Sequence, residues 1–135
     1  MNKLKQEQKI DLVKIASQVR KWAYTPYSNY QVGAAVLTGS GRIYDGVNIE
    51  NAAFSLTVCA ERTAIFKAVS NGEKKFQAIA VVTKDGGTPC GSCRQVMAEF
   101  SPEMLVIVAN DKGKIIMEKK LSDLLPSAFG ADNLK

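Results

Sequence analysis

The sequence contains no histidine among its 135 residues. This absence excludes nucleophilic sites of the Ser-His-Asp and Cys-His types, because both use a histidine to move protons. Proton transfer near neutral pH would have to come from a carboxylate with a perturbed pKa or from water bound to a metal. Acidic residues and metal ligands are therefore the candidates for chemistry.

Cysteine is also scarce, with three residues in the chain. A small, odd number does not make a disulfide scaffold, and free or metal-bound thiols are typical of cytoplasmic proteins. No apolar run approaches the roughly 20 residues that a membrane span needs. The opening segment, MNKLKQEQKI, is polar with alternating charges, unlike a signal peptide. We therefore expect a cytoplasmic protein without a membrane partner.

The charge balance is basic, with a net charge of +5 and an isoelectric point of about 9.2. Such a balance admits nucleic acid as a partner. However, the lysines and arginines are scattered along the chain, and no basic stripe is interleaved with aromatic residues. A solvated surface explains this pattern better, so nucleic acid is not an expected partner.

The patterning of apolar residues predicts one domain over residues 1–135. Helices are predicted at 4–23, 58–72, 90–100 and 121–126, and strands at 30–38, 43–50, 76–83, 104–109 and 114–118. Strands joined through a helix are expected to run parallel, and strands joined by a hairpin antiparallel. The fold class predicted is therefore α/β, a three-layer α/β/α sandwich with a mixed sheet of about five strands.

All three cysteines fall near predicted helix starts. Cys90 and Cys93 form a C-x-x-C motif within TPCGSCRQ, and Cys59 lies near the start of the helix at 58–72. A helix N-terminus lowers a thiol pKa through its free N–H groups and its positive dipole end. Three thiolates converging on one metal would leave a tetrahedral position open, as in catalytic zinc sites.

Three explanations of the cysteines other than a catalytic metal site remain open at this point. A redox pair would need a thioredoxin-like context and leaves Cys59 without a role. A structural zinc site would need a fourth ligand, and the sequence has neither a histidine nor a fourth cysteine to supply it. The cysteines could also be inert buried thiols.

Two residues that follow Cys59 favour a catalytic metal site. Glu61 lies two positions on, about 200° around a helix, which suits a carboxylate beside a metal-bound water rather than a fourth ligand. Arg62 lies three positions on, on the same face as Cys59, where it can offset the charge of three thiolates. Taken singly, an acidic residue in a first helical turn or a surface arginine is common.

The motifs CAER at 59–62 and PCGSCRQ at 89–95 together resemble the small homotetrameric zinc-dependent cytidine deaminases. The segments TPYSNYQVGAAVLT, NIENAAF, CAERTAIFKAVS, PCGSCRQVMAEF and LLPSAF extend the resemblance over nearly the whole chain. The resemblance implies hydrolytic deamination of cytidine and deoxycytidine to uridine and deoxyuridine plus ammonia, as in pyrimidine salvage. It implies one Zn²⁺ per chain, attack by zinc-bound hydroxide, and a homotetramer with shared sites.

The resemblance also implies roles for individual residues. It implies Cys59, Cys90 and Cys93 as zinc ligands, Glu61 as proton shuttle, Arg62 as charge compensation, and Tyr30, Asn48, Glu50, Ala60 and Phe129 as substrate-binding residues. Asn48 and Glu50 match the residues that hold the ribose, and their spacing at a strand end predicts side chains on the same side. Phe129 matches an aromatic residue that the family contributes to a neighbouring subunit's site.

Three positions depart from the family pattern. Tyr30 falls where a phenylalanine usually stacks near the pyrimidine, Phe54 replaces a common tyrosine, and the loop KDGGT before Pro89 is short. These departures bear on substrate preference rather than on the chemistry.

Three alternative functions follow from the same residues. A blasticidin-type or free-base deaminase would not need the ribose-binding pair in NIEN. A polynucleotide deaminase should carry a basic or aromatic groove beside the site, which the flanking segments lack. A non-catalytic, zinc-stabilised binding module would not need an intact Glu61.

Overall fold

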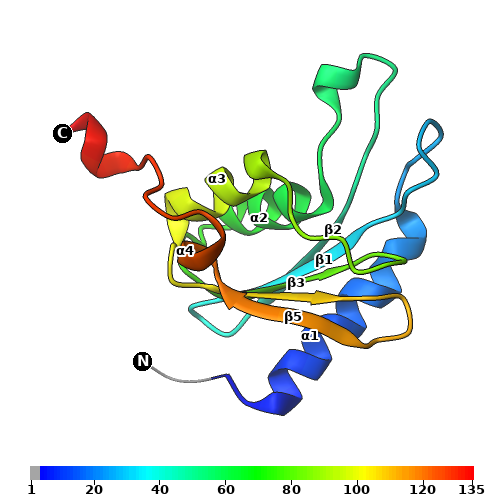
Figure 1. Cartoon of the computed structure of the whole chain (residues 1–135), viewed down its shortest axis with the longest axis horizontal. Helices are drawn as coiled ribbons and strands as arrows, with labels where there is room; N and C mark the ends of the chain where they lie inside the picture. Colours follow the sequence, from blue (N-terminus) through cyan, green and yellow to red (C-terminus); the bar gives the residue numbers. More distant parts are fainter. Residues whose placement is uncertain (1–3) are drawn as a thin grey trace.

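The computed structural model describes residues 4–135 and contains one five-stranded sheet flanked by helices (Figure 1). The strands are β1 (Gly33–Thr38), β2 (Ile43–Val47), β3 (Phe76–Val82), β4 (Leu105–Ala109) and β5 (Ile115–Lys120). The α-helices are α1 (Gln6–Val19), α2 (Ala60–Ser70), α3 (Gly91–Phe100) and α4 (Leu121–Leu124). The predicted order of helices and strands is confirmed.

The strand order in the sheet is β2-β1-β3-β4-β5. β3 and β4, which are joined through α3, pair in parallel as predicted, and the hairpin pairs β1–β2 and β4–β5 are antiparallel. β2 and β3 are also joined through a helix, but β1 lies between them and pairs antiparallel with both. The helix-linked strands β2 and β3 therefore point the same way without being neighbours, which the sequence pattern did not predict.

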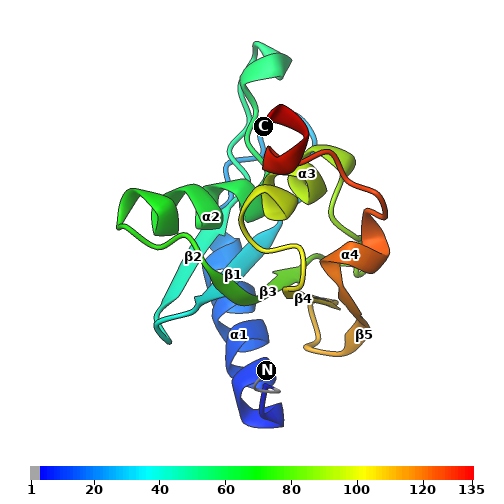
Figure 2. The ribbon, with the colours of Figure 1, turned by 90° about the vertical axis from the view of Figure 1, so that its left-hand side faces the viewer.

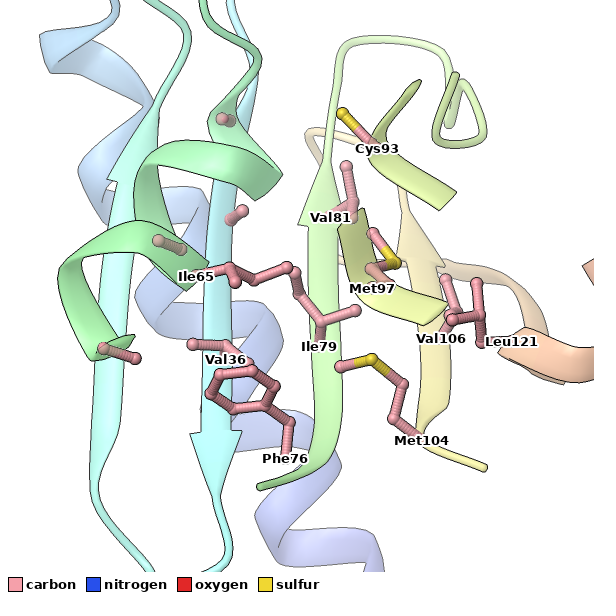
Figure 3. Packing of buried hydrophobic residues seen from close by; sticks show 14 of the residues in the cluster. Val36, Ile65, Phe76, Ile79, Val81, Cys93, Met97, Met104, Val106 and Leu121 are labelled. Atoms are coloured by element: carbon pink, nitrogen blue, oxygen red, sulfur yellow. The ribbon is translucent and has the colours of Figure 1, made fainter. Parts of the chain in front are cut away.

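Helices cover both faces of the sheet, so the predicted three-layer sandwich is confirmed. Figure 1 shows α1 on one face and α2 and α3 on the other, and Figure 2 shows the same separation after a 90° turn. The core under α1 includes Leu12, Ala16 and Ile107, all inaccessible to solvent. Figure 3 shows the second core, in which Ile65 of α2 and Met97 of α3 pack on the sheet and Cys93 lies at one end, beyond Val81.

Several predicted elements were too long. The first helix ends at Val19 and continues as a single 3₁₀ turn over Arg20–Trp22. β1 starts at Gly33 and β2 ends at Val47, so Tyr30, Asn48 and Glu50 all lie outside regular strands. These three residues belong to irregular segments at the edge of the sheet, where side-chain direction no longer follows strand alternation.

α2 approaches β2 closely at Gly46. A Cβ atom placed there would come within 2.5 Å of the Ala64 nitrogen and 2.9 Å of the Ala60 carbonyl oxygen. Only glycine leaves room for backbone contact at this distance. Gly46 therefore fixes how close the start of α2, with Cys59 and Glu61, lies to the sheet.

Within residues 4–135, no helix has the length and apolar character that crossing a membrane requires.

Candidate active site

The three cysteines meet at the N-terminal ends of α2 and α3, as predicted. Cys59 is the N-cap residue of α2, Cys90 is the N-cap residue of α3, and Cys93 lies in the first turn of α3. The Sγ atoms of Cys59 and Cys90 are 3.9 Å apart, and those of Cys90 and Cys93 are 3.6 Å apart. All three sulfur atoms lie within 4.8 Å of one another.

This spacing fits a zinc ion. A Zn–S bond is about 2.3 Å, so two thiolates in a tetrahedral site are separated by about 3.8 Å. Two of the sulfur–sulfur distances lie close to that value without any movement of the backbone. Glu61 is not in the group of possible ligands found among residues 4–135, so the fourth position is not taken by a protein carboxylate. The cysteines can therefore hold Zn²⁺ with one position left for water or substrate.

The surroundings of the sulfurs favour a thiolate at Cys59. The pKa of the Cys59 thiol is lowered to about 5, because Cys93 donates a hydrogen bond to it and the Arg62 guanidinium lies beside it. The same shared hydrogen bond raises the pKa of Cys93, so one of the two thiols holds the proton that the other gives up. Arg62 Nη2 donates to Cys59 Sγ over 3.4 Å, which confirms the predicted contact between the arginine and a cysteine. Both helix N-termini add positive partial charge at the same point.

Glu61 is buried beside the cysteine cluster. Its side chain belongs to the first turn of α2 and is only 4% exposed. Burial raises the pKa of the Glu61 carboxyl to about 7, and the nearby Cys59 charge acts in the same direction. A carboxyl group with this pKa can both accept and release a proton near neutral pH.

Glu61 lines a small cavity together with two of the three cysteines. The cavity has a volume of about 210 Å³. Its walls also include Tyr30, Val32, Asn48, Thr57, Ala60, Val81, Thr83, Gly87 and Thr88. Three residues singled out from the sequence, Tyr30, Asn48 and Ala60, thus lie in one cavity with the metal ligands.

The Asn48 side chain is largely engaged by the chain itself. Its Oδ1 accepts a hydrogen bond from the Val32 N–H over 3.0 Å, and its Nδ2 donates to the Tyr30 carbonyl over 2.8 Å. These bonds hold the segment before β1 against the end of β2. One amide hydrogen of Nδ2 is left for a further partner, because an amide group carries two.

Glu50 lines a second cavity, not the one that Asn48 lines. This cavity, of about 390 Å³, is lined by Tyr27, Ser28, Glu50, Phe54 and Thr57. Glu50 Oε1 accepts from the Tyr27 and Ser28 N–H groups over 3.0 and 3.1 Å, and the Ser28 hydroxyl donates to Oε2. These hydrogen bonds, that of the Ser28 hydroxyl above all, lower the pKa of Glu50.

Thr57 lines both cavities, so the two spaces adjoin. The ring of Phe54, one of the departures noted in the sequence, packs edge-to-face on Tyr27 with ring centroids 6.1 Å apart. Asn48 and Glu50 therefore border two connected spaces, and the prediction that both hold the same ribose stays a prediction.

Phe129 does not reach either cavity of its own chain. Its ring is 57% exposed, and its carbonyl oxygen accepts a hydrogen bond from Gln95 Nε2 over 2.8 Å. Arg94 of α3 donates to the Pro89 and Leu124 carbonyls, which ties the loop before Cys90 to the end of α4. The C-terminal segment extends away from the sheet beyond this tie (Figure 1).

A larger cavity, of about 740 Å³, lies at the other end of the sheet. Its walls include Phe76 at the start of β3 and Leu105 at the start of β4, with Phe100 and Lys75 nearby. It contains none of the cysteines and no buried carboxylate. Volume alone therefore does not identify the site, and the chemistry lies in the smaller cavity.

Sequence reasoning missed three residues that shape this smaller cavity. Thr83, Asp85 and Gly87 lie between β3 and α3, where the sequence analysis placed Thr83 at the end of a strand and Asp85 and Gly87 in the short loop KDGGT, without a role for any of the three. The Thr83 Oγ1 accepts from the Gly86 and Gly87 N–H groups, and Tyr30 donates to Asp85. No local pattern signals such contacts, because Tyr30 and Asp85 are 55 positions apart.

The three-thiolate cluster beside a buried carboxyl group is the arrangement of a zinc-dependent hydrolytic enzyme. Comparison with known proteins supports the assignment to a zinc-dependent hydrolytic enzyme. The family model for the cytidine and deoxycytidylate deaminase zinc-binding region matches residues 6–109. The chain belongs to this family.

Similarity to individual proteins extends over nearly the whole chain. The cytidine deaminase of Sporosarcina psychrophila is 51% identical over 126 residues, which cover 91% of this chain and 92% of that protein. The cytidine deaminase of Halalkalibacterium halodurans is 52% identical over 126 residues, which cover 91% of this chain and 95% of that protein. The crystal structure of cytidine deaminase from Burkholderia pseudomallei superposes with a TM-score of 0.85 at 42% identity, covering 93% of this chain and 100% of that one.

Proposed function

We propose that this protein deaminates cytidine and deoxycytidine hydrolytically, giving uridine and deoxyuridine plus ammonia. The observation that carries this proposal is Glu61, whose buried carboxyl group lines a small cavity beside the three-cysteine cluster. The identity of 51–52% to two cytidine deaminases over about nine tenths of the chain supports the choice of substrate.

The proposed mechanism assigns the metal to Cys59, Cys90 and Cys93. Zinc bound there would act as a Lewis acid that lowers the pKa of a bound water toward about 7. Glu61 accepts a proton from the attacking water and delivers it to N3 of the cytosine ring. The water oxygen forms a bond to C4, and Glu61 then takes the remaining proton of that C4 hydroxyl and transfers it to the leaving amine as the C4–N4 bond breaks, so water and cytidine become uridine and ammonia. A carboxyl pKa of about 7 suits a group that must perform both transfers.

Arg62 and the two helix N-termini are assigned to charge compensation. Three thiolates around Zn²⁺ carry a net negative charge, which weakens its attraction for electrons. The hydrogen bond from Arg62 Nη2 to Cys59 Sγ withdraws part of that charge. The Arg62 Nε atom is buried without a hydrogen-bond partner among residues 4–135, so a further donor is directed into the same region.

The nucleoside is proposed to lie across both cavities. The base occupies the 210 Å³ cavity with Glu61, and the sugar extends past Thr57 into the cavity that holds Glu50. Glu50 is ionised and can accept a hydrogen bond from a sugar hydroxyl. The free hydrogen of Asn48 Nδ2 can donate to the same sugar. Such contacts would distinguish nucleosides from free cytosine.

A homotetramer with shared sites is the proposed assembly. Phe54, Leu56 and Phe129 are exposed, and exposed apolar side chains that gather into a patch mark protein–protein interfaces. The segment containing Phe54 and Leu56 extends from the body of the molecule next to the Glu50 cavity (Figures 1 and 2). A neighbouring chain's Phe129 could then close a site that is open in a single chain.

The decisive experiment measures zinc content and turnover together. Purified protein is assayed for ammonia release and loss of cytosine absorbance with cytidine, deoxycytidine, free cytosine, blasticidin S and single-stranded DNA. We expect one zinc per chain and turnover of the two nucleosides. Zinc binding without turnover of any substrate would instead support a non-catalytic module, and turnover of blasticidin S or DNA alone would support the corresponding alternative.

A further inference from the structure

A hydrogen bond links the two halves of the site through the tyrosine that departs from the family pattern. The Tyr30 hydroxyl donates to Asp85 Oδ1 over 2.7 Å. Tyr30 belongs to the segment before β1, which Asn48 holds in place. Asp85 belongs to the loop between β3 and α3, which leads directly to the ligand Cys90.

The loop that contains Asp85 is organised around Thr83. The Gly86 and Gly87 N–H groups donate to Thr83 Oγ1 over 2.8 and 2.7 Å. The Thr83 hydroxyl in turn donates to Asp85 Oδ1 over 3.2 Å. The oxygen that receives the Tyr30 hydroxyl is thus also fixed from within the loop. The Tyr30 hydroxyl therefore donates to an acceptor, Asp85 Oδ1, that hydrogen bonds within the loop already hold in place.

Gly87 provides the space for this hydroxyl. A Cβ atom at position 87 would lie 2.6 Å from the Tyr30 hydroxyl oxygen, a distance that carbon and oxygen atoms do not adopt without displacement. The next nearest atoms, on Asp85 and Thr83, are at ordinary contact distances of 3.7 and 3.8 Å. The ring carbons of Tyr30 are not among these three nearest atoms, so the hydroxyl alone occupies the space that a side chain at position 87 would need.

We propose that Tyr30 is a positioning residue, whose hydroxyl clamps the loop of residues 83–89 against the base cavity through Asp85 and Gly87. Tyr30, Gly87, Thr88 and Cys90 all line that cavity, so the clamp sets the position of one of its walls. A phenylalanine would keep the ring but leave the loop without this attachment. The inference rests on the proposed function for its kinetic consequence, but the attachment itself is independent of the reaction.

The kinetic test compares Tyr30→Phe, Asp85→Ala and the double variant. Loss of the bond lets the cavity wall move, so each single variant should raise KM for cytidine about five- to tenfold, the effect of one hydrogen bond to a charged group at a partly exposed site. We expect kcat and zinc content to change little, and the double variant to resemble the single ones. Multiplied effects in the double variant, or an unchanged KM in Tyr30→Phe, would overturn the proposal.

A rescue experiment tests the fit at Gly87. Gly87→Ala should raise KM in the natural background, because its Cβ would collide with the Tyr30 hydroxyl. In the Tyr30→Phe background the same substitution should have no further effect, since the colliding oxygen is gone. Gly39→Ala, whose Cβ would meet neighbours no closer than 3.4 Å at a remote site, is the matched control. An equal rise in KM caused by Gly87→Ala in both backgrounds would contradict the proposed fit.

Hydrogen exchange separates this inference from the proposed function. The Gly86 and Gly87 amides should exchange faster in Tyr30→Phe than in the natural protein, while amides of α1 exchange equally in both. This readout needs no substrate. If the natural protein does not turn over cytidine, the proposed function fails, and unchanged exchange at residues 86 and 87 would still refute the clamp.

Discussion

The sulfur atoms of Cys59 and Cys90 lie 3.9 Å apart, although 31 positions separate the two residues in the chain. Each cysteine is the N-cap residue of a helix, and both helices start at the same end of the sheet on the same face. The contact joins α2, which supplies Glu61 and Arg62, to α3, which supplies Cys93. Metal binding here therefore depends on the correct packing of two helices on one sheet.

Removing one ligand should release the metal. Cys90→Ala leaves two thiolates, so we expect loss of zinc and a fall in melting temperature of about 5 to 10 °C, because metal binding free energy adds to folding free energy. Ser92→Ala, an exposed position in the same helical turn, is the control and should keep its zinc. Metal analysis and calorimetry check both; a fully active, metal-free Cys90→Ala protein would exclude the proposed centre.

Replacing Glu61 should separate folding from catalysis. Glu61→Gln keeps the shape but cannot move protons, so turnover of cytidine should fall about 10²- to 10⁴-fold with zinc retained. The melting temperature should not fall, because burial already disfavours the ionised carboxylate, as its raised pKa shows. Glu99→Gln on the exposed side of α3 is the control. Turnover like that of the natural protein in Glu61→Gln would assign the proton transfer elsewhere.

Glu50 should contribute to recognition of the sugar and not to binding of the metal. Glu50→Ala is expected to lower kcat/KM for cytidine about ten- to a hundredfold at unchanged zinc content, since a buried sugar hydroxyl would lose its acceptor. In the natural protein, cytidine and deoxycytidine should both react, whereas free cytosine and 3′-deoxycytidine should react poorly. Steady-state kinetics on the four compounds test this, with Glu99→Ala as control. Equal kcat/KM for cytidine and cytosine would show that the sugar is not recognised.

Phe129 should matter to a neighbouring chain. Deleting the residues after Pro126 removes Phe129 together with the carbonyl that Gln95 binds, so we expect a raised KM or no activity. Phe129→Ala should reproduce the kinetic effect, whereas Leu134→Ala, which is 80% exposed, should not. Sedimentation of the natural protein should give a tetramer. A fully active monomer would disprove the shared site.

The close approach at Gly46 should be intolerant of a side chain. Gly46→Ala would force its Cβ within 2.5 Å of the Ala64 nitrogen, so α2 must shift outward. We expect a loss of about 1 to 3 kcal/mol in the free energy of unfolding, typical of overpacking, together with weaker zinc binding. Denaturant titration measures the first effect, and Gly39→Ala again serves as control. An unchanged midpoint would show that the helix can adjust freely.

Much of the fold followed from local pattern. The order of helices and strands, the helix starts at Cys59 and Cys90, and the layers of the sandwich were predicted because helical and strand periodicities are local properties. The insertion of β1 between β2 and β3 was not, since it depends on which strand edges pair after the chain has folded back. Strand ends were also misplaced around Tyr30 and Asn48, where side-chain hydrogen bonds replace the regular ladder.

The sequence by itself supplied the residues of the chemistry: three cysteines, one carboxylate two residues after the first of them, and no histidine, within motifs that resemble the zinc-dependent cytidine deaminases. Tertiary structure alone decided how that chemistry is enclosed. It placed Asn48 and Glu50 on two adjoining cavities and brought Tyr30 to Asp85 across 55 positions. The physical reason is that ligand identity and helix starts are encoded by neighbouring residues, whereas the walls of a cavity come from segments that meet only through packing.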